Sequence, residues 1–285
     1  MTIQEATKLS RERLQEIYDE GEATAITVWL LESIVGSPKN ERAGSIRQPL
    51  DDAQQATLES RLNRLINHEP LQYVLGETWF CGLKFYVDER VLIPRPETEE
   101  LVEWVIAGCK FPLDELAILD IGTGSGCISV TLKRRLGKSQ VTGIDKSHDA
   151  LDVARKNANS IGVELSLLEV DFLDPEQSDQ MPSFDIIISN PPYIPLRDKE
   201  TMSANVVDFE PGIALFVSDN DPFIFYKAII RFASEHLKEN GSVDVEMHED
   251  LAKETQALFA ANGFDTAIRQ DMQGKERMLR AWPKV

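Results

Sequence analysis

The sequence predicts an α/β protein in which a mostly parallel sheet, with helices on both faces, follows a small N-terminal helical domain. Apolar residues recur at helical spacing through the first 75 residues. From about residue 116, short apolar runs alternate with amphipathic stretches, as in proteins with parallel sheets. The last two apolar runs have no helical stretch between them, which predicts an antiparallel edge strand.

The N-terminal 75 residues contain two stretches with one apolar face. In "TLESRLNRLINHEPLQYVL" this face is formed by Leu58, Leu62, Leu65 and Ile66. In the earlier stretch it is formed by Ile26, Trp29, Leu30, Ile34 and Val35. The turn-forming segments "YDEGEAT" and "GSPKN" are predicted to separate the helices. Residues 1–75 are therefore expected to form a helical domain.

Residues 76–95 are predicted to form a β-hairpin or an extended linker, because "GETWFCGLKFYVDERVLIP" mixes aromatic residues, Val and Gly. Pro94 and Pro96 would end any strand. A helix should follow, because Glu97, Glu99 and Glu100 suit the positive end of a helix. The third predicted domain is 96–285.

Within that domain the alternation predicts seven strands and the helices between them. The expected strands are 116–122, 140–145, 164–170, 184–189, 242–247, 265–270 and 277–282. The expected helices are 127–137, 147–162, 222–241 and 249–263. Residues between 190 and 221 are expected to be irregular.

The composition excludes several classes of protein. A net charge of −18, from 30 basic and 48 acidic residues, repels phosphate backbones, and no Lys/Arg run would form a local basic groove. No direct DNA binding is therefore expected, although the charge is equally explained as a solubility feature. No apolar run reaches the length of a membrane span, and the N-terminus has no signal-peptide pattern. Single cysteines at 81, 109 and 127 fit a reducing cytoplasm and no metal site.

A glycine-rich loop follows the first strand of the predicted sheet. "LDIGTGSGCIS" places Gly122, Gly124 and Gly126, with Thr123 and Ser125 between them, before a helix N-terminus. Glycines there permit a tight turn and a close approach of the backbone to a ligand. The pattern is neither the usual dinucleotide motif nor a P-loop.

Acidic residues at the ends of the next strands indicate an adenosine cofactor. Asp145 is placed to accept hydrogen bonds from two ribose hydroxyls, and Phe172, after Asp171, to flank an adenine. Asp145 is alternatively an acid at a helix N-terminus, and Phe172 a core residue. With Asp120 before the loop, the pattern resembles the Rossmann-like fold of S-adenosylmethionine-dependent methyltransferases more than a nicotinamide dehydrogenase.

The fourth strand ends in Asn190-Pro191-Pro192-Tyr193. Proline restricts the preceding residue to an extended conformation and has no N–H, so the segment presents acceptors without competing donors. The Asn190 side-chain oxygen and a backbone carbonyl could hold a planar NH₂ group, with Tyr193 against its flat face. The motif resembles that of methyltransferases acting on such groups. A merely rigid turn is the alternative.

The chain resembles the release-factor glutamine N5-methyltransferases over nearly its whole length. The resemblance is carried by "VLIPRPETEELVE", "LDIGTGSGCIS", "ISNPPYIP", "FEPGIALFVSDND" and "DMQGKERMLRAW". It implies methyl transfer from S-adenosylmethionine to the Gln side-chain nitrogen in the Gly-Gly-Gln motif of class-I peptide-chain release factors. It implies cofactor binding by the 122–126 loop, Asp145, Phe172 and Asn190, and substrate binding by residues 190–193. The helical domain would dock the release factor.

Two segments depart from the family pattern, "EMHED" (Glu246–Asp250) and "VSDNDPF" (Val217–Phe223). His248 in the first is expected to be a solvated helix-start residue rather than a base. The alternatives left open are methylation of a ribosomal-protein glutamine, N6-adenine methylation of nucleic acid, and a non-catalytic S-adenosylmethionine-binding adaptor.

Overall fold

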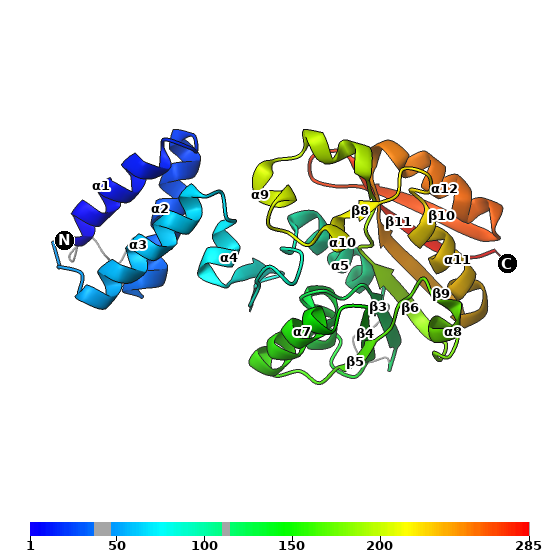
Figure 1. Ribbon diagram of the computed structural model, residues 1–285. Coiled ribbons are helices and arrows are strands. Elements are labelled where there is room, and N and C mark those ends of the chain that lie inside the picture. The colour runs from blue at the N-terminus through cyan, green and yellow to red at the C-terminus, as the bar shows by residue number, and fades with distance from the viewer. Residues whose placement is uncertain (37–46, 110–114, 285) are drawn as a thin grey trace. The chain divides into compact units, whose positions relative to one another are not determined.

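The computed structural model describes residues 1–36, 47–109 and 115–284. These residues form two compact units, both drawn in Figure 1. The first unit contains Met1–Gly76 together with Ser203–Phe209, and the second contains Glu77–Met202 and Glu210–Val285. Each unit has its own hydrophobic core.

The first unit is helical. Its elements are α1 (Ile3–Leu14), α2 (Glu20–Val35), α3 (Asp52–Ile66), α4 (Leu71–Leu75) and the short α9 (Ala204–Val207). The side chains of Thr2, Asp19 and Asp51 accept backbone N–H bonds at the starts of α1, α2 and α3. These caps fix where each helix begins.

The predicted apolar face of α3 is buried, with Leu58, Leu62 and Leu65 in the core of the helical unit. The predicted face of α2 is wrong at Trp29, which is 49% exposed. Ile26 and Leu30 are buried, as predicted. The other buried residues of α2 lie on the side of these two that is away from Trp29, so Trp29 is outside the buried face.

The predicted helix breaks lie partly elsewhere. Helix α2 begins at Glu20, so Gly21 to Thr24 of "YDEGEAT" are helical and Asp19 is the cap. Gly36 of "GSPKN" ends α2 with φ +73°, a left-handed conformation that suits glycine. Residues 37–40 lie outside the described part of the chain.

The second unit begins with a β-hairpin. Its strands β1 (Thr78–Phe80) and β2 (Leu83–Phe85) are antiparallel. Cys81 and Gly82 form the turn, both with positive φ. Helix α5 (Pro96–Gly108) follows with Pro96 at its start and Glu97 and Glu99 in its first turn.

A seven-stranded sheet forms the centre of the second unit, in the order β10-β11-β9-β6-β3-β4-β5 (Figure 1). The five strands from β9 to β5 are parallel, and β11 is antiparallel to both neighbours. The predicted fold class is therefore confirmed. The strands are β3 (Ala117–Ile121), β4 (Gln140–Asp145), β5 (Ser166–Glu169), β6 (Phe184–Ser189), β9 (Leu237–Glu246), β10 (Phe264–Gln270) and β11 (Glu276–Pro283).

Helices cover both faces of this sheet, and alternate residues of one strand enter different cores. In β3, Ile118 packs with α5 and α6 (Cys127–Arg135), whereas Leu119 packs with α11 (Ile224–His236) and α12 (Ala252–Ala261). Ile186 and Ile187 of β6 divide in the same way. This alternation explains why the central strands are apolar throughout. Helix α7 (His148–Ile161) connects β4 and β5.

The predicted helix at 222–241 is wrong at its end. Helix α11 stops at His236, and β9 begins at Leu237 with an extended backbone. Leu237 pairs with Phe184 of β6, and a Cβ on Gly241 would lie only 2.8 Å from the Asp185 carbonyl oxygen. Pairing with a distant strand thus overrides the helical character of "LKENG".

The stretch expected to be irregular contains short elements. They are β7 (Ile194–Pro195), a 3₁₀ helix η2 (Leu196–Thr201), α9, α10 (Gly212–Leu215) and β8 (Phe216–Val217). Strands β7 and β8 pair in parallel. Two further short helices are α8 (Pro175–Ser178) and the 3₁₀ helix η3 (Glu249–Leu251).

Candidate functional site

A pocket opens beyond the carboxyl ends of β3, β4 and β6, where open α/β sheets bind their ligands. It brings together residues that are far apart in the sequence. The predicted site residues that line it are Gly122, Gly124, Asp145, Phe172, Asn190, Pro191 and Pro192. Thr123, Ser125, Gly126 and Tyr193, also predicted for the site, are not among its lining residues.

The glycine loop has the conformation that its sequence predicts. Gly122, Gly124 and Gly126 all have positive φ, at +73°, +53° and +78°, a region that side chains with a Cβ disfavour. The backbone N–H groups of Gly122 and Thr123 both donate to the Ile144 carbonyl, so the loop is held against β4. A Cβ on Gly126 would lie 3.1 Å from the Ala154 Cβ in α7. The third glycine therefore serves helix packing rather than ligand contact.

Asp120 lies fully buried beneath this loop and organises it. Its Oδ2 atom accepts hydrogen bonds from the Thr123 hydroxyl at 2.6 Å and from the Ser129 N–H at 3.1 Å. Oδ1 has no hydrogen-bond partner among the described residues. Burial raises the pKa of Asp120 to about 7, although these hydrogen bonds act against the shift.

Asp145 ends β4 and faces the pocket. Its carboxylate accepts the N–H of Ser147 at 2.9 Å and that of Gly124 at 3.0 Å, one on each oxygen. Each oxygen keeps a second lone pair, so hydroxyl groups of a ligand can still be accepted. Ser147, not Asp145, caps α7. Burial raises the pKa of Asp145.

Phe172 is both a core residue and a lining residue of the pocket. The ring is 5% exposed and packs edge-on against Phe232, 5.4 Å between centroids. It also lines the pocket, next to Val170 and Asp171. The apolar end of the pocket is thus continuous with the core that α11 covers.

Asn190 follows β6, and its side chain is oriented by a neighbour on α5. The Asn190 Nδ2 atom donates to the Thr98 hydroxyl at 2.9 Å. The Thr98 hydroxyl in turn donates to Oε2 of Glu246 at 2.6 Å. Glu246 is 1% exposed at the end of β9. Burial raises its pKa, and the bonds from Thr98 and Tyr193 partly offset that rise.

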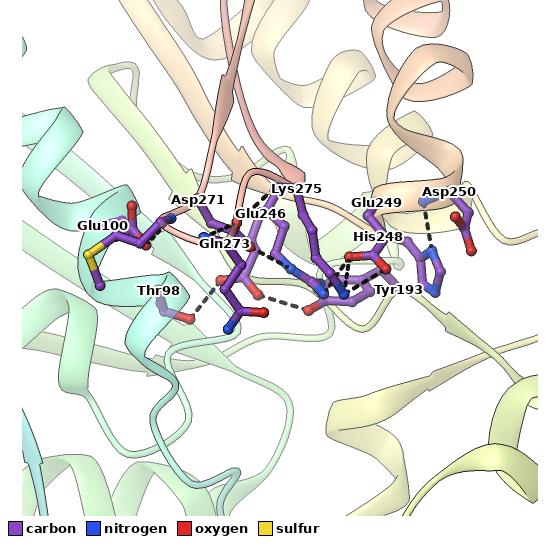
Figure 2. A network of polar contacts seen from close by, with 12 residues as sticks. Thr98, Glu100, Tyr193, Glu246, His248, Glu249, Asp250, Asp271, Gln273 and Lys275 are labelled. Carbon is purple, nitrogen blue, oxygen red and sulfur yellow. Dashed lines mark hydrogen bonds and ion pairs between the residues drawn. The ribbon is translucent and has the colours of Figure 1, made fainter.

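Tyr193 reaches the same carboxylate from the other side (Figure 2). Its hydroxyl donates to Oε1 of Glu246 at 2.8 Å. Burial, followed by the negative charge of Glu246, raises the pKa of Tyr193 well above its usual value. The Tyr193 side chain is therefore anchored by its hydroxyl, a feature that the motif alone does not predict.

Glu210 joins two walls of the pocket. One of its oxygens accepts the Ile93 N–H at 3.1 Å, and the other pairs with Arg95 at 2.6 Å. The Glu210 side chain is 1% exposed. The segment just before Ile93 (90–92) and the segment just after Glu210 (211–214) both contribute to the pocket lining, so the bonds of the buried Glu210 carboxylate fix their spacing.

Sequence reasoning missed Thr98, Glu210 and Glu246 as residues of the site. Thr98 and Glu210 lie in segments that carry the resemblance to the family, "VLIPRPETEELVE" and "FEPGIALFVSDND", whereas Glu246 begins "EMHED", a segment that departs from it. His248 is the cap of η3 and accepts the Asp250 N–H through Nδ1, as expected of a helix-start residue. In the described ranges, no cluster of His, Cys, Asp and Glu fits a metal ion, and no helix is long and apolar enough to cross a bilayer.

Two family models match the chain. The methyltransferase small domain matches residues 110–209, and the PrmC N-terminal domain matches residues 5–76. The chain is 42% identical to a release factor glutamine methyltransferase of Flavobacterium psychrophilum, over 94% of each chain.

The chain belongs to the release factor glutamine methyltransferase family. A second family member, from Bacteroides thetaiotaomicron, is 36% identical over 96% of this chain and 98% of its own length. A solved methyltransferase structure from Pyrococcus furiosus has a TM-score of 0.54 and 16% identity, covering 82% of this chain and 100% of that chain. This last likeness supports the fold alone.

Membership in this family implies the use of S-adenosylmethionine, and the pocket fits that molecule. Gly122 has nothing within 4 Å of the position where a Cβ would stand, so the loop leaves room for a ligand. Asp145 offers acceptors for hydroxyl groups, and Phe172 offers an apolar wall for a base.

Proposed function

We propose that this protein transfers a methyl group from S-adenosylmethionine to the side-chain nitrogen (N5) of the glutamine in the Gly-Gly-Gln motif of class-I release factors. One observation carries the proposal. A single pocket is lined by the glycine loop, by Asp145 and by Asn190-Pro191-Pro192, in a chain of this family.

The cofactor half of the pocket is formed by the loop and the ends of β4 and β5. We assign Gly122 and Gly124 to the methionine portion, because their backbone can approach it closely. Asp145 would accept the ribose hydroxyls and Phe172 would contact the adenine. When bound, S-adenosylmethionine supplies an electrophilic methyl group on a sulfonium that departs as a neutral thioether.

The amide half of the pocket is formed by residues 190–192. The Asn190 Oδ1 atom and the carbonyl groups of the two prolines are acceptors for the two N–H groups of a glutamine amide. Holding both hydrogens lets the nitrogen pyramidalise, which reduces the delocalisation of its lone pair into the carbonyl and directs that lone pair toward the methyl donor. Positioning of this kind supplies much of the rate, so a strong general base is not required. The nitrogen becomes acidic once methylated and gives its proton to water.

The helical unit (Met1–Gly76 with Ser203–Phe209) is our candidate for the docking surface of the release factor. Trp29 is exposed on α2, and exposed aromatic residues are common anchors at protein interfaces. The net charge of −18 supports a protein partner over bare nucleic acid.

The direct test is incubation of the purified protein with labelled S-adenosylmethionine and purified class-I release factors, followed by mass spectrometry of the modified peptide. We expect one methyl group on the glutamine of Gly-Gly-Gln. Label on a ribosomal protein alone, or on an oligonucleotide whose binding weakens steeply with salt, would replace the proposal. Failure to label any macromolecule in a cell extract would indicate a binding protein.

A further inference from the structure

The buried Thr98 hydroxyl connects the Asn190 amide to the carboxylate of Glu246, the last residue of β9. Glu246 accepts from Thr98 and from Tyr193, one hydrogen bond on each carboxylate oxygen (Figure 2). Thr98 is 2% exposed and accepts from Asn190 Nδ2. Thr98, Tyr193 and Glu246 are not among the residues that line the pocket, so Asn190 is the member of this group that reaches it.

The donor and the acceptor of each hydrogen bond in this series are set by the Glu246 carboxylate. A carboxylate with a donor on each oxygen is an acceptor only. The Thr98 hydroxyl has a single proton, which is used on Glu246, so toward Asn190 it can only accept. Asn190 must therefore present its NH₂ group to Thr98. The Oδ1 atom of Asn190 is then the part of the amide left to face the pocket.

We propose that Glu246, acting through Thr98, is a positioning residue that fixes the orientation of the Asn190 amide so that its oxygen receives the substrate NH₂ group. An Asn side chain flipped by 180° would present its own NH₂ to the substrate NH₂ and repel it. The inference rests on the proposed function for its kinetic part only, since the orientation of Asn190 is a property of the free protein.

Substitutions of Thr98 separate this role from simple packing. Thr98→Val keeps the volume and removes the hydroxyl, whereas Thr98→Ser keeps the hydroxyl and removes the methyl group. We expect Thr98→Val to lower kcat by roughly tenfold to a hundredfold, the usual effect of losing such a hydrogen bond. Thr98→Ser should retain most of kcat. If Thr98 only packs, the order of the two variants reverses.

Glu246→Gln tests whether Glu246 sets the direction of these hydrogen bonds. A Gln side chain has an NH₂ donor on one arm, which turns the Thr98 or the Tyr193 hydroxyl around. We expect kcat to fall about as far as in Thr98→Val, with the KM for S-adenosylmethionine unchanged. The double variant should be no slower than the slower single variant, because both break one chain. Additive losses would overturn the proposal.

A measurement without substrate keeps the inference independent of the proposed function. In protein labelled with ¹⁵N-asparagine, the Asn190 side-chain NH₂ signal is assigned by its loss in Asn190→Asp. We expect its protons to exchange slowly with water in the wild type and in Thr98→Ser, and rapidly in Thr98→Val. Equal protection in all three overturns the inference. Absence of release-factor methylation by the wild type overturns the proposed function alone.

Discussion

The Tyr193 hydroxyl donates a 2.8 Å hydrogen bond to Oε1 of Glu246, so the last residue of the Asn-Pro-Pro-Tyr motif is tied to the end of a different strand. The first residue of the motif is tied, through Thr98, to the other oxygen of the same carboxylate. Both ends of the motif are thereby anchored on one buried acid, with the two prolines held between them at the pocket.

Removing this anchor should slow methyl transfer without weakening cofactor binding. We expect Tyr193→Phe, which loses only the hydroxyl, to lower kcat by about tenfold. Tyr193→Ala should lower it further, because it also removes the ring, and Pro192→Ala should lower kcat because it releases the backbone that the proline fixes. Steady-state rates and calorimetric titration with S-adenosylmethionine provide the two measurements. Methylation of a release factor by Tyr193→Ala or Pro192→Ala at the wild-type rate would contradict the role assigned to the motif.

The pH dependence of kcat should contain an acid limb that belongs to Glu246. Burial raises its pKa; bonds from Thr98 and Tyr193 and the charge of Arg277 lower it, whereas Glu97 raises it again. The Tyr226 hydroxyl donates its hydrogen bond to the backbone carbonyl of Glu246 and not to the carboxylate. Because the ionised form orients Thr98, activity should be lost as the pH falls through this raised pKa.

Glu246→Gln supplies the control for that limb. Its residual kcat should lack the Glu246 component, whereas titration of Asp120 or Asp145 remains in both proteins and cancels in the ratio of their rates. A ratio that stays constant from about pH 5 to about pH 9 would show that Glu246 does not titrate in the active protein.

Stability should depend on pH through Asp120. Its pKa is about 7 in the folded protein against 3.8 for an ordinary Asp, so the folded state binds more protons between these values. Stability therefore rises as the pH falls through about 7. Relative to Asp120→Asn, the wild type should gain about 2 kcal/mol between about pH 8.5 and about pH 5.5. Urea unfolding of both proteins at the two pH values measures this, and equal changes in the two would refute it.

Substitution at Gly126 should damage the fold more than substitution at an unconstrained glycine. In Gly126→Ala the new methyl group meets Ala154 at 3.1 Å and the backbone stays at φ +78°. We expect a loss of about 2 kcal/mol or more in unfolding free energy. Gly137→Ala is the matched control, because Gly137 is exposed with nothing within 4 Å of the added carbon. Similar unfolding free energies for the two variants would contradict this account.

Local sequence was sufficient to predict the alternating elements and the positions of the motifs. Strands such as Phe184–Ser189 are apolar because both faces of the sheet are covered, and the run of apolar residues can be recognised in the sequence. The glycine spacing in 122–126 likewise reflects local φ values. Predictions failed where distant contacts decide, as at Leu237, whose strand pairs with β6, and at Trp29, which lies outside the buried stripe of α2.

The sequence by itself determined the fold class, the glycine loop and the position of the Asn-Pro-Pro-Tyr motif, because each is encoded by neighbouring residues. Only the tertiary structure decided how the motif is held. Thr98, Asn190 and Glu246 come from α5, the end of β6 and the end of β9. Their hydrogen bonds span up to 148 positions of sequence, and which donors a buried carboxylate collects depends on the packing of those three elements around it.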